Sequence, residues 1–189
     1  MKTKITILKH AFLMVIIGFS MTIKGYSQTL QTPSEGKSLV YFVRSNGTGA
    51  LINFKFFDGE KYLGKFNGVK YFIYECDPGE HVFWASSENR SFVEAELESG
   101  KVYFMEVRPT PGAIKSAVKL VPISPDNEKG MKRINKFISK KAPYDLDSKD
   151  FSDEAEDLDF FIGNGMKKYN SDKEKDKNIA KMPSNYAIN

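Results

Sequence analysis

From residue 38 to residue 121 the chain is a series of short apolar and aromatic runs, each followed by a turn signal. In several runs apolar and polar residues alternate with the period of two that a half-buried strand shows. The predicted strands lie at 38–44, 54–57, 62–66, 69–76, 81–85, 91–97, 102–108 and 114–121. This spacing predicts a mainly β fold, a small antiparallel β-sandwich-like domain.

Glycine, proline and aspartate mark the predicted turns. The pair at 58–59 is the favoured two-residue type I′ hairpin signal, because the twist of that turn matches the strands it joins. Residues 77–80 predict a type II turn, which splays strands and so passes the chain between two sheets. A second tight hairpin is predicted at 99–100. The residues assigned to structural turns are Asp58, Gly59, Asp77, Pro78, Gly79, His81 and Gly100.

The run at 69–76 is nearly continuous in strand-forming residues. Such a run indicates that both faces of the strand are covered, so this strand is predicted to be central in its sheet. Residues 109–112 contain two prolines and a glycine. They are predicted to break the pattern before a last strand at 114–121.

After residue 121 the apolar period becomes helical. Ser124 is the predicted N-cap and Pro125 the first helical residue of a helix over 125–140. The residues on its apolar face are Met131, Ile134, Phe137 and Ile138. This helix is expected to lie against the sheet or to cover an edge strand, so the domain is taken as 38–141.

Residues 142–189 form an acidic and then mixed-charge tail with few apolar groups, which cannot form a core alone. Apolar residues at helical spacing predict a helix over 152–169, with a disordered end beyond it. One hypothesis is that this helix rests on its own domain or stays solvated. The other is that it folds on contact with a partner.

Residues 1–27 have the pattern of a cleaved secretory signal, with lysines before the apolar run at 11–19 and the small residues Gly25 and Ser27 at its end. A flexible lead is expected over 28–37. The chain is therefore predicted to be exported, to the periplasm or the extracellular space. No cysteine follows the apolar run, so a lipid anchor is not expected. The alternative is an uncleaved anchor, and only then is membrane contact expected.

The charge balance argues against nucleic acid as a partner. The formal net charge is +4, and the four lysines of residues 1–27 account for all of it. A neutral mature chain lacks the single-sign field with which nucleic-acid binders displace counterions.

Few residues suit metal or covalent chemistry. Cys76 is the only cysteine, and His81 is the only histidine after residue 27. They are too few for a structural zinc site, and no metal or cofactor is expected. One hypothesis is an enzyme in which His81 faces Cys76 across a tight hairpin and lowers the pKa of its thiol. The competing interpretation is a buried cysteine beside a histidine that fixes its turn by hydrogen bonding.

The domain is rich in amphipathic rings. Most are expected in the core, but an exposed cluster of three or more would favour stacking on sugars or gripping a peptide. The candidates for such binding are Tyr62, Tyr71, Tyr74, Trp84 and Tyr103. An adaptor for envelope proteins would instead show an open edge strand or a free tail helix.

Several segments, in their order and spacing, resemble the DUF2846 family of bacterial envelope proteins. They are 39–44, 56–59 with 63–64, 77–81, 97–104 and 120–121, and they span roughly 38–140. The Asp-Gly turn and the Pro-Gly-x-His corner also resemble PEGA-type modules. The resemblance implies a small β-sandwich-like domain, often exported and often lipidated, with no established activity. This chain departs from the family by lacking a lipidation signal and by its long tail.

These observations lead us to expect an exported, non-enzymatic envelope domain that acts in binding or scaffolding. Its expected partner is an envelope protein. The alternative is a carbohydrate- or peptide-binding module that uses surface aromatics and takes an envelope glycan or a peptide. A third hypothesis is a Cys76-based enzyme.

Overall fold

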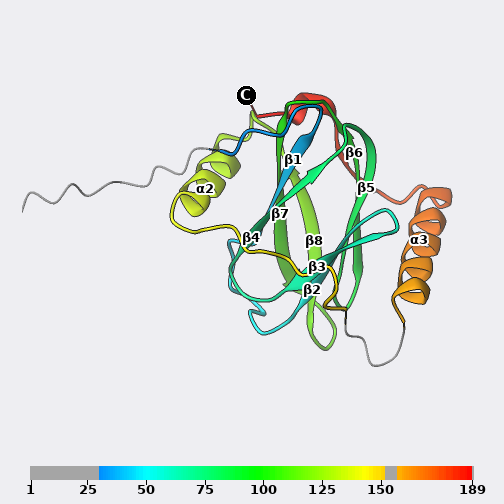
Figure 1. Cartoon of the computed structure of the whole chain (residues 1–189). Helices are drawn as coiled ribbons and strands as arrows, with labels where there is room; N and C mark the ends of the chain where they lie inside the picture. Colours follow the sequence, from blue (N-terminus) through cyan, green and yellow to red (C-terminus); the bar gives the residue numbers. More distant parts are fainter. Residues whose placement is uncertain (1–29, 152–156, 189) are drawn as a thin grey trace, which may run out of the picture.

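The computed structural model describes residues 30–151 and 157–188, and within these ranges nine strands form two sheets. Sheet A has the strand order β4-β1-β7-β8, and sheet B has the order β3-β2-β5-β6-β9. The strands are β1 (Ser38–Val43), β2 (Phe54–Asp58), β3 (Lys61–Phe66), β4 (Tyr71–Cys76), β5 (Gly79–Ser86), β6 (Arg90–Leu97), β7 (Val102–Pro111), β8 (Ser116–Ile123) and β9 (Ala180–Met182). The sheets pack face to face (Figure 1), so the predicted mainly β, sandwich-like fold is confirmed. The predicted signal at 1–27 lies outside the described residues.

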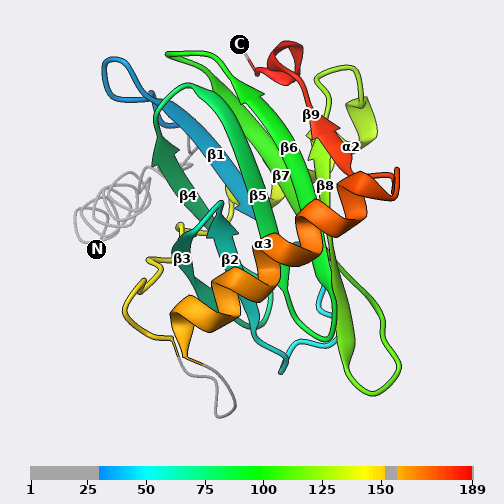
Figure 2. The same ribbon diagram turned by 90° about the vertical axis from the view of Figure 1, so that its right-hand side faces the viewer.

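Two helices extend the sandwich to four layers (Figure 1). α2 (Glu128–Ile138) covers the outer face of sheet A, and α3 (Leu158–Glu174) covers the outer face of sheet B. Figure 2 shows α3 lying diagonally across sheet B. A short 3-10 helix, η1 (Ser184–Tyr186), follows β9. None of the helices in the described ranges has the length and apolar character needed to cross a bilayer.

The core between the sheets is built around phenylalanines. Phe42 of β1 stacks on Phe72 of β4 with ring centroids 4.7 Å apart, and it meets Phe83 of β5 edge to face at 5.5 Å. Phe56 of β2 meets Phe72 at 5.1 Å. Burying one such side chain contributes about 1.5–3 kcal/mol. These contacts therefore hold sheet A against sheet B.

The outer faces of both sheets are also apolar. On sheet A, Tyr41 and Phe104 pack in one cluster with Ile134 and Ile138 of α2. The predicted apolar face of this helix, and its predicted place against a sheet, are thereby confirmed. On sheet B, Trp84 packs with residues of α3 in a separate cluster. Because both faces of each sheet are covered, many strands are apolar throughout instead of alternating.

β4 is one of the two edge strands of sheet A, so the prediction of a central strand at 69–76 is wrong. Both its faces are nevertheless covered: Phe72 faces the core between the sheets, and Tyr71 faces the cluster under α2. At the edge itself, the Tyr144 N–H donates to the Tyr71 carbonyl at 2.7 Å. A continuous apolar run therefore indicates two covered faces, and it does not indicate the strand's lateral position.

The first hairpin forms where predicted, but its loop lies one residue further on. Asp58 pairs with Lys61, which leaves Gly59 and Glu60 as the loop. Gly59 has a φ of 54°, and among the described residues Asp176 alone is a non-glycine residue with positive φ. A positive φ at the first loop residue only is typical of type II′, so the predicted type I′ is wrong.

The two later turns both carry the chain from one sheet to the other. The passage predicted at 77–80 is confirmed, because β4 belongs to sheet A and β5 to sheet B. The hairpin predicted at 99–100 is wrong, because β6 lies in sheet B and β7 in sheet A. β7 pairs in parallel with β1, and the Gly100 N–H donates to the Lys37 carbonyl at 2.7 Å. A glycine that is typical of a tight hairpin is therefore equally compatible with a corner between two sheets.

β7 continues through Pro109 and Pro111 to form a hairpin with β8, so the predicted break at 109–112 is wrong. The register places Pro109 opposite Val118. The Val118 N–H and carbonyl bind the side chain of Asn89 at 2.7 and 2.9 Å, so they point away from β7. At such a non-hydrogen-bonded pair the proline needs no N–H, which is why the strand tolerates it.

α2 begins later than predicted. Its N-cap is Asn127, whose Oδ1 accepts a hydrogen bond from the Gly130 N–H at 3.0 Å. The predicted cap, Ser124, instead accepts from the Asp126 N–H at 3.3 Å. Ser124 thus forms a local turn that precedes the helix.

The chain after residue 142 is part of the sandwich. α3 rests on its own domain, as one of the two tail hypotheses held, although residues 152–156 of the expected helix lie outside the described residues. The expected disordered end is wrong for 180–188: β9 pairs in parallel with β6, and the Ile188 N–H donates to the Val102 carbonyl at 2.7 Å. The lead is bound too, since the Gln31 N–H donates to the Tyr41 hydroxyl at 2.8 Å.

Candidate functional site

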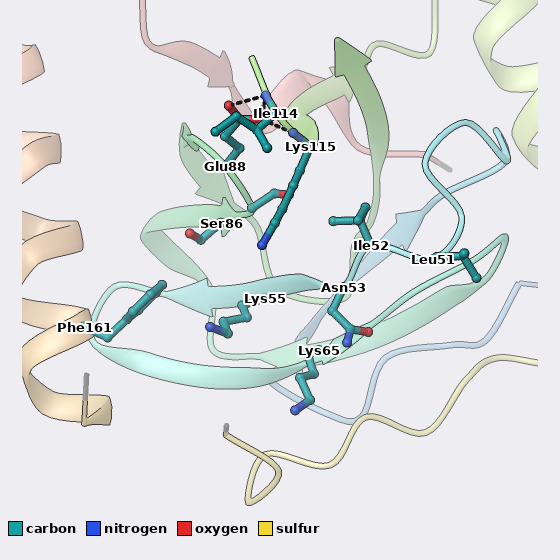
Figure 3. Close-up of a pocket in the computed structure, with 11 residues that line it drawn as sticks. Leu51, Ile52, Asn53, Lys55, Lys65, Ser86, Glu88, Ile114, Lys115 and Phe161 are labelled. Atoms are coloured by element: carbon teal, nitrogen blue, oxygen red, sulfur yellow. Dashed lines mark hydrogen bonds between the residues drawn. The ribbon is translucent and has the colours of Figure 1, made fainter. Parts of the chain in front are cut away.

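A cavity of about 470 Å³ opens at one end of the sandwich (Figure 3). We call it the end pocket. It lies between the loop before β2, the turn between β5 and β6, and the loop of the β7–β8 hairpin, with α3 at one side. Its lining residues are Leu51, Ile52, Asn53, Lys55, Lys65, Ser86, Ser87, Glu88, Ile114, Lys115 and Phe161.

The loop before β2 is held by a buried arginine. The Arg44 guanidinium donates to the carbonyls of Thr48 at 3.1 Å, Gly49 at 2.7 Å and Ile52 at 3.1 Å. It also lies 4.0 Å over the Phe54 ring, and its burial lowers the pKa of Arg44. This one side chain therefore fixes the path of the loop and turns Leu51 outward, where it is 88% exposed.

The hairpin loop on the other side is held by a carboxylate. Glu88 accepts hydrogen bonds from the backbone N–H groups of Ala113 at 2.8 Å, Ile114 at 3.0 Å and Lys115 at 2.7 Å. These bonds, that from Lys115 first, lower the pKa of the Glu88 carboxyl, because they favour its charged form. Figure 3 shows the bonds to Ile114 and Lys115. The Ile114 side chain is left 90% exposed.

Cations line the floor of the end pocket. Lys55 of β2 lies directly opposite Lys65 of β3 in the strand register. The Lys55 ammonium is 4.6 Å from the centre of the Phe161 ring, and Lys65 forms an ion pair with Asp150 at 3.0 Å. The side chain of Lys115 extends toward the strand that carries Lys55 (Figure 3). The lining thus carries three lysines against one acid, Glu88, while Asp150 pairs with Lys65. The remaining excess of positive charge favours an anionic ligand.

The aromatic residues expected to bind a ligand are almost all buried. The side chains of Tyr62, Tyr71 and Trp84 are buried because α2, α3 and the segments beside them cover both outer sheet faces, and Tyr103 is buried in the core between the sheets. Tyr74 is half-buried, and its hydroxyl donates to Asp58 at 3.1 Å. The exposed aromatic cluster required for sugar stacking is therefore not formed by these five residues.

Cys76 and His81 do not face each other. They lie on strands of different sheets, and Ser38 is the β1 residue paired with Cys76. Burial raises the pKa of the Cys76 thiol to about 12, which keeps it protonated at neutral pH. The geometry on which the thiol-enzyme hypothesis depended is thus contradicted.

His81 fixes the corner between the sheets, as the competing interpretation held. Its Nδ1 lies 2.8 Å from Asp58 Oδ2, and its Nε2 lies 2.9 Å from the Asp77 carbonyl. The hydrogen bond to Asp58 raises the pKa of His81. The predicted turn residues Asp58, Asp77 and His81 therefore meet in one network, in which Asp58 links the β2–β3 hairpin to the start of β5.

The residues that shape the end pocket were not predicted from the sequence. Ile114 was expected to begin the last strand, which is wrong, because β8 begins at Ser116 and Ile114 lies in the loop before it. Leu51 and Ile114 are apolar residues inside glycine- and proline-rich loops, and that placement is the signal that could have found them. Glu88 gave no such signal, because its role depends on a loop that is distant in the sequence.

The fold and the end pocket define a two-sheet sandwich with a helix on each outer face and a cationic, apolar-rimmed pocket at one end. No family model matches this sequence. No curated protein matches it either. In the ranges 30–151 and 157–188 no group of three or more metal-ligating side chains is close enough to hold a metal ion.

Proposed function

We propose that this protein is an exported, non-enzymatic envelope domain that binds another protein, and that the end pocket is its binding site. One observation carries the proposal. Leu51 and Ile114, 88% and 90% exposed, are the most exposed large apolar residues in the described part of the chain, and both line the same cavity. Apolar side chains that rigid loops present to solvent beside a pocket are typical of interaction sites.

The chemistry of the pocket favours a partner segment that is both acidic and apolar. Lys115 and the lysines of the floor complement carboxylates, while Leu51 and Ile114 would bury apolar side chains of the partner. Full burial of one such side chain contributes about 1.5–3 kcal/mol. The DUF2846-like resemblance suggests that the partner is an envelope protein.

The experiment is site-specific photo-crosslinking in the native host envelope. A photoreactive phenylalanine analogue replaces Ile114 in one variant and Leu51 in a second. In the matched control it replaces Phe160, which is 58% exposed on α3 and does not line the end pocket. One cross-linked product common to the Ile114 and Leu51 variants, and missing from the Phe160 control, would support the proposal.

Affinity capture with serine variants provides a second test. The double variant Leu51→Ser, Ile114→Ser should lose the partner in an affinity capture, while Phe160→Ser should retain it. If neither loop position cross-links, or if all three give the same products, the end pocket is not the binding site.

A further inference from the structure

One side of α2 and the turn after it carry a stripe of cations. Its members are Lys129, Lys132, Arg133 and Lys136 of the helix and Lys140 of the turn, all of them exposed. The four helical residues recur at intervals of one, three and four residues and so share one face of the helix. The buried residues Ile134 and Ile138 hold the opposite face against sheet A. The stripe therefore points away from sheet A.

Part of this arrangement opposes the stability of the helix. Lys132 and Lys136 are like charges four residues apart, and such pairs destabilise a helix, although Lys136 in the last turn is favoured by the helix dipole. Lys129 lies in the first turn, where the helix dipole disfavours a cation. Among the described residues no acidic side chain forms an ion pair with any of these four lysines, and Arg133 alone in the stripe is paired, with Glu106 at 2.8 Å. Arg133 thus ties α2 to the buried Glu106 of β7, whereas the four lysines make no ion pair within the described ranges that holds the fold.

An apolar depression of about 290 Å³ lies beside the stripe. Phe137 lines it together with the side chains of Arg133, Lys136 and Lys140. A surface that offers anionic groups next to aliphatic groups would satisfy both features at once. Phospholipids with anionic headgroups offer this combination, whereas nucleic acid offers phosphate without aliphatic chains.

We propose that the outer face of α2 binds the surface of a bilayer that contains anionic phospholipids. The stripe attracts the headgroups, and the depression at Phe137 takes aliphatic groups at the interface. Contact is peripheral, since the apolar face of α2 stays buried against sheet A. The inference does not depend on the function proposed for the end pocket, which lies at the end of the sandwich and shares no lining residue with this surface.

Vesicle co-sedimentation tests the proposal. The protein is used from residue 28, the expected product of signal cleavage, which retains every described element. The probes are phosphatidylcholine vesicles with and without about one third phosphatidylglycerol, near 0.1 M salt and again at roughly 0.5 M. Binding is expected only with phosphatidylglycerol, and it should weaken at the higher salt because the contacts are exposed.

The charge variant is the triple change Lys129→Gln, Lys132→Gln, Lys136→Gln. Each lysine near an anionic surface is worth about fivefold in affinity, so the triple variant should bind on the order of 100-fold more weakly. The same three positions changed to arginine should retain binding. The matched control changes Lys119, Lys167 and Lys175 to glutamine, which removes the same charge from exposed sites elsewhere. It should lie within about twofold of wild type.

Three results would overturn the proposal: equal sedimentation with both vesicle types, equal loss in the triple variant and its control, or no vesicle binding. Salt-sensitive dimerisation without vesicle binding would instead assign the stripe to the acidic surface of a second copy. Far-ultraviolet circular dichroism of each variant verifies that α2 remains folded.

Discussion

Gly165 of α3 lies against the indole ring of Trp84, so close that a Cβ on Gly165 would stand 2.7 Å from Trp84 Cζ2. Trp84 is fully buried, and its Nε1 donates to the Gly59 carbonyl at 2.8 Å, so the ring cannot move aside without losing that bond. The absence of a side chain at residue 165 therefore sets how closely α3 approaches sheet B.

Replacing Gly165 by alanine should loosen α3. Although alanine favours a helix, the overlap with Trp84 should lower the free energy of unfolding by about 1–3 kcal/mol. Gly163→Ala is the matched control, because a Cβ there meets open space. That variant should gain about 0.5–1 kcal/mol from helix propensity. Urea denaturation measures both, and a stabilised Gly165→Ala variant would show that α3 does not rest tightly on Trp84.

Removing Asn89 should expose the edge of β8. Asn89→Ala takes away both hydrogen bonds to the Val118 backbone, and leaving these groups unpaired should cost about 1–3 kcal/mol. The open edge should also make the variant aggregate sooner on heating. Asn135→Ala on the exposed side of α2 is the control. Equal stability and equal light scattering in the two variants would contradict the proposed role of Asn89.

The His81–Asp58 pair should make stability depend on pH. Because the folded pKa of His81 is raised, its contribution is fully present below the ordinary histidine pKa of about 6.5 and is lost as the pH rises through the folded pKa. Thermal unfolding from pH 6 to pH 9 should therefore show a decline in wild type that is smaller in His81→Gln. Parallel curves would mean that His81 does not titrate in this window.

Glu88 should release the hairpin loop in acid. Its folded pKa is lowered, so its hold on the loop is present above the ordinary carboxyl pKa of about 4.3 and is lost as the pH falls through the folded value. The amide proton shifts of Ala113 and Lys115 should report this loss in an NMR titration. In Glu88→Gln both shifts should lie near the acid-limit values at every pH. A variant that keeps the wild-type shifts at neutral pH would refute this anchoring role.

Elements set by adjacent residues could be predicted from the sequence, whereas the pairing of strands that are distant in the sequence could not. The strands, the apolar face of α2 and the passage between sheets at 77–80 were all predictable, since each depends on adjacent residues. The corner at 99–100 was not, because a hairpin and a sheet-to-sheet corner need the same glycine, and only the pairing of β7 with β1 separates them.

The end pocket shows the same limit. Exposed apolar residues in loops can be noticed in a sequence, but nothing local shows that Leu51 and Ile114 line one cavity. Glu88 holds a loop more than twenty residues away. The predicted aromatic site failed for a related reason, because the burial of Trp84 depends on α3, whose docking partner could not be identified from its own sequence.

The position of β9 also affects the order in which the chain can fold. Its partner strand β6 is complete at Leu97, yet Ala180 pairs with Val93 across most of the domain's length. Contacts between such distant positions form slowly, because the intervening chain must first be ordered. The edge of sheet B at β6 therefore stays unpaired until residues 180–182 join it, late in the folding of the domain.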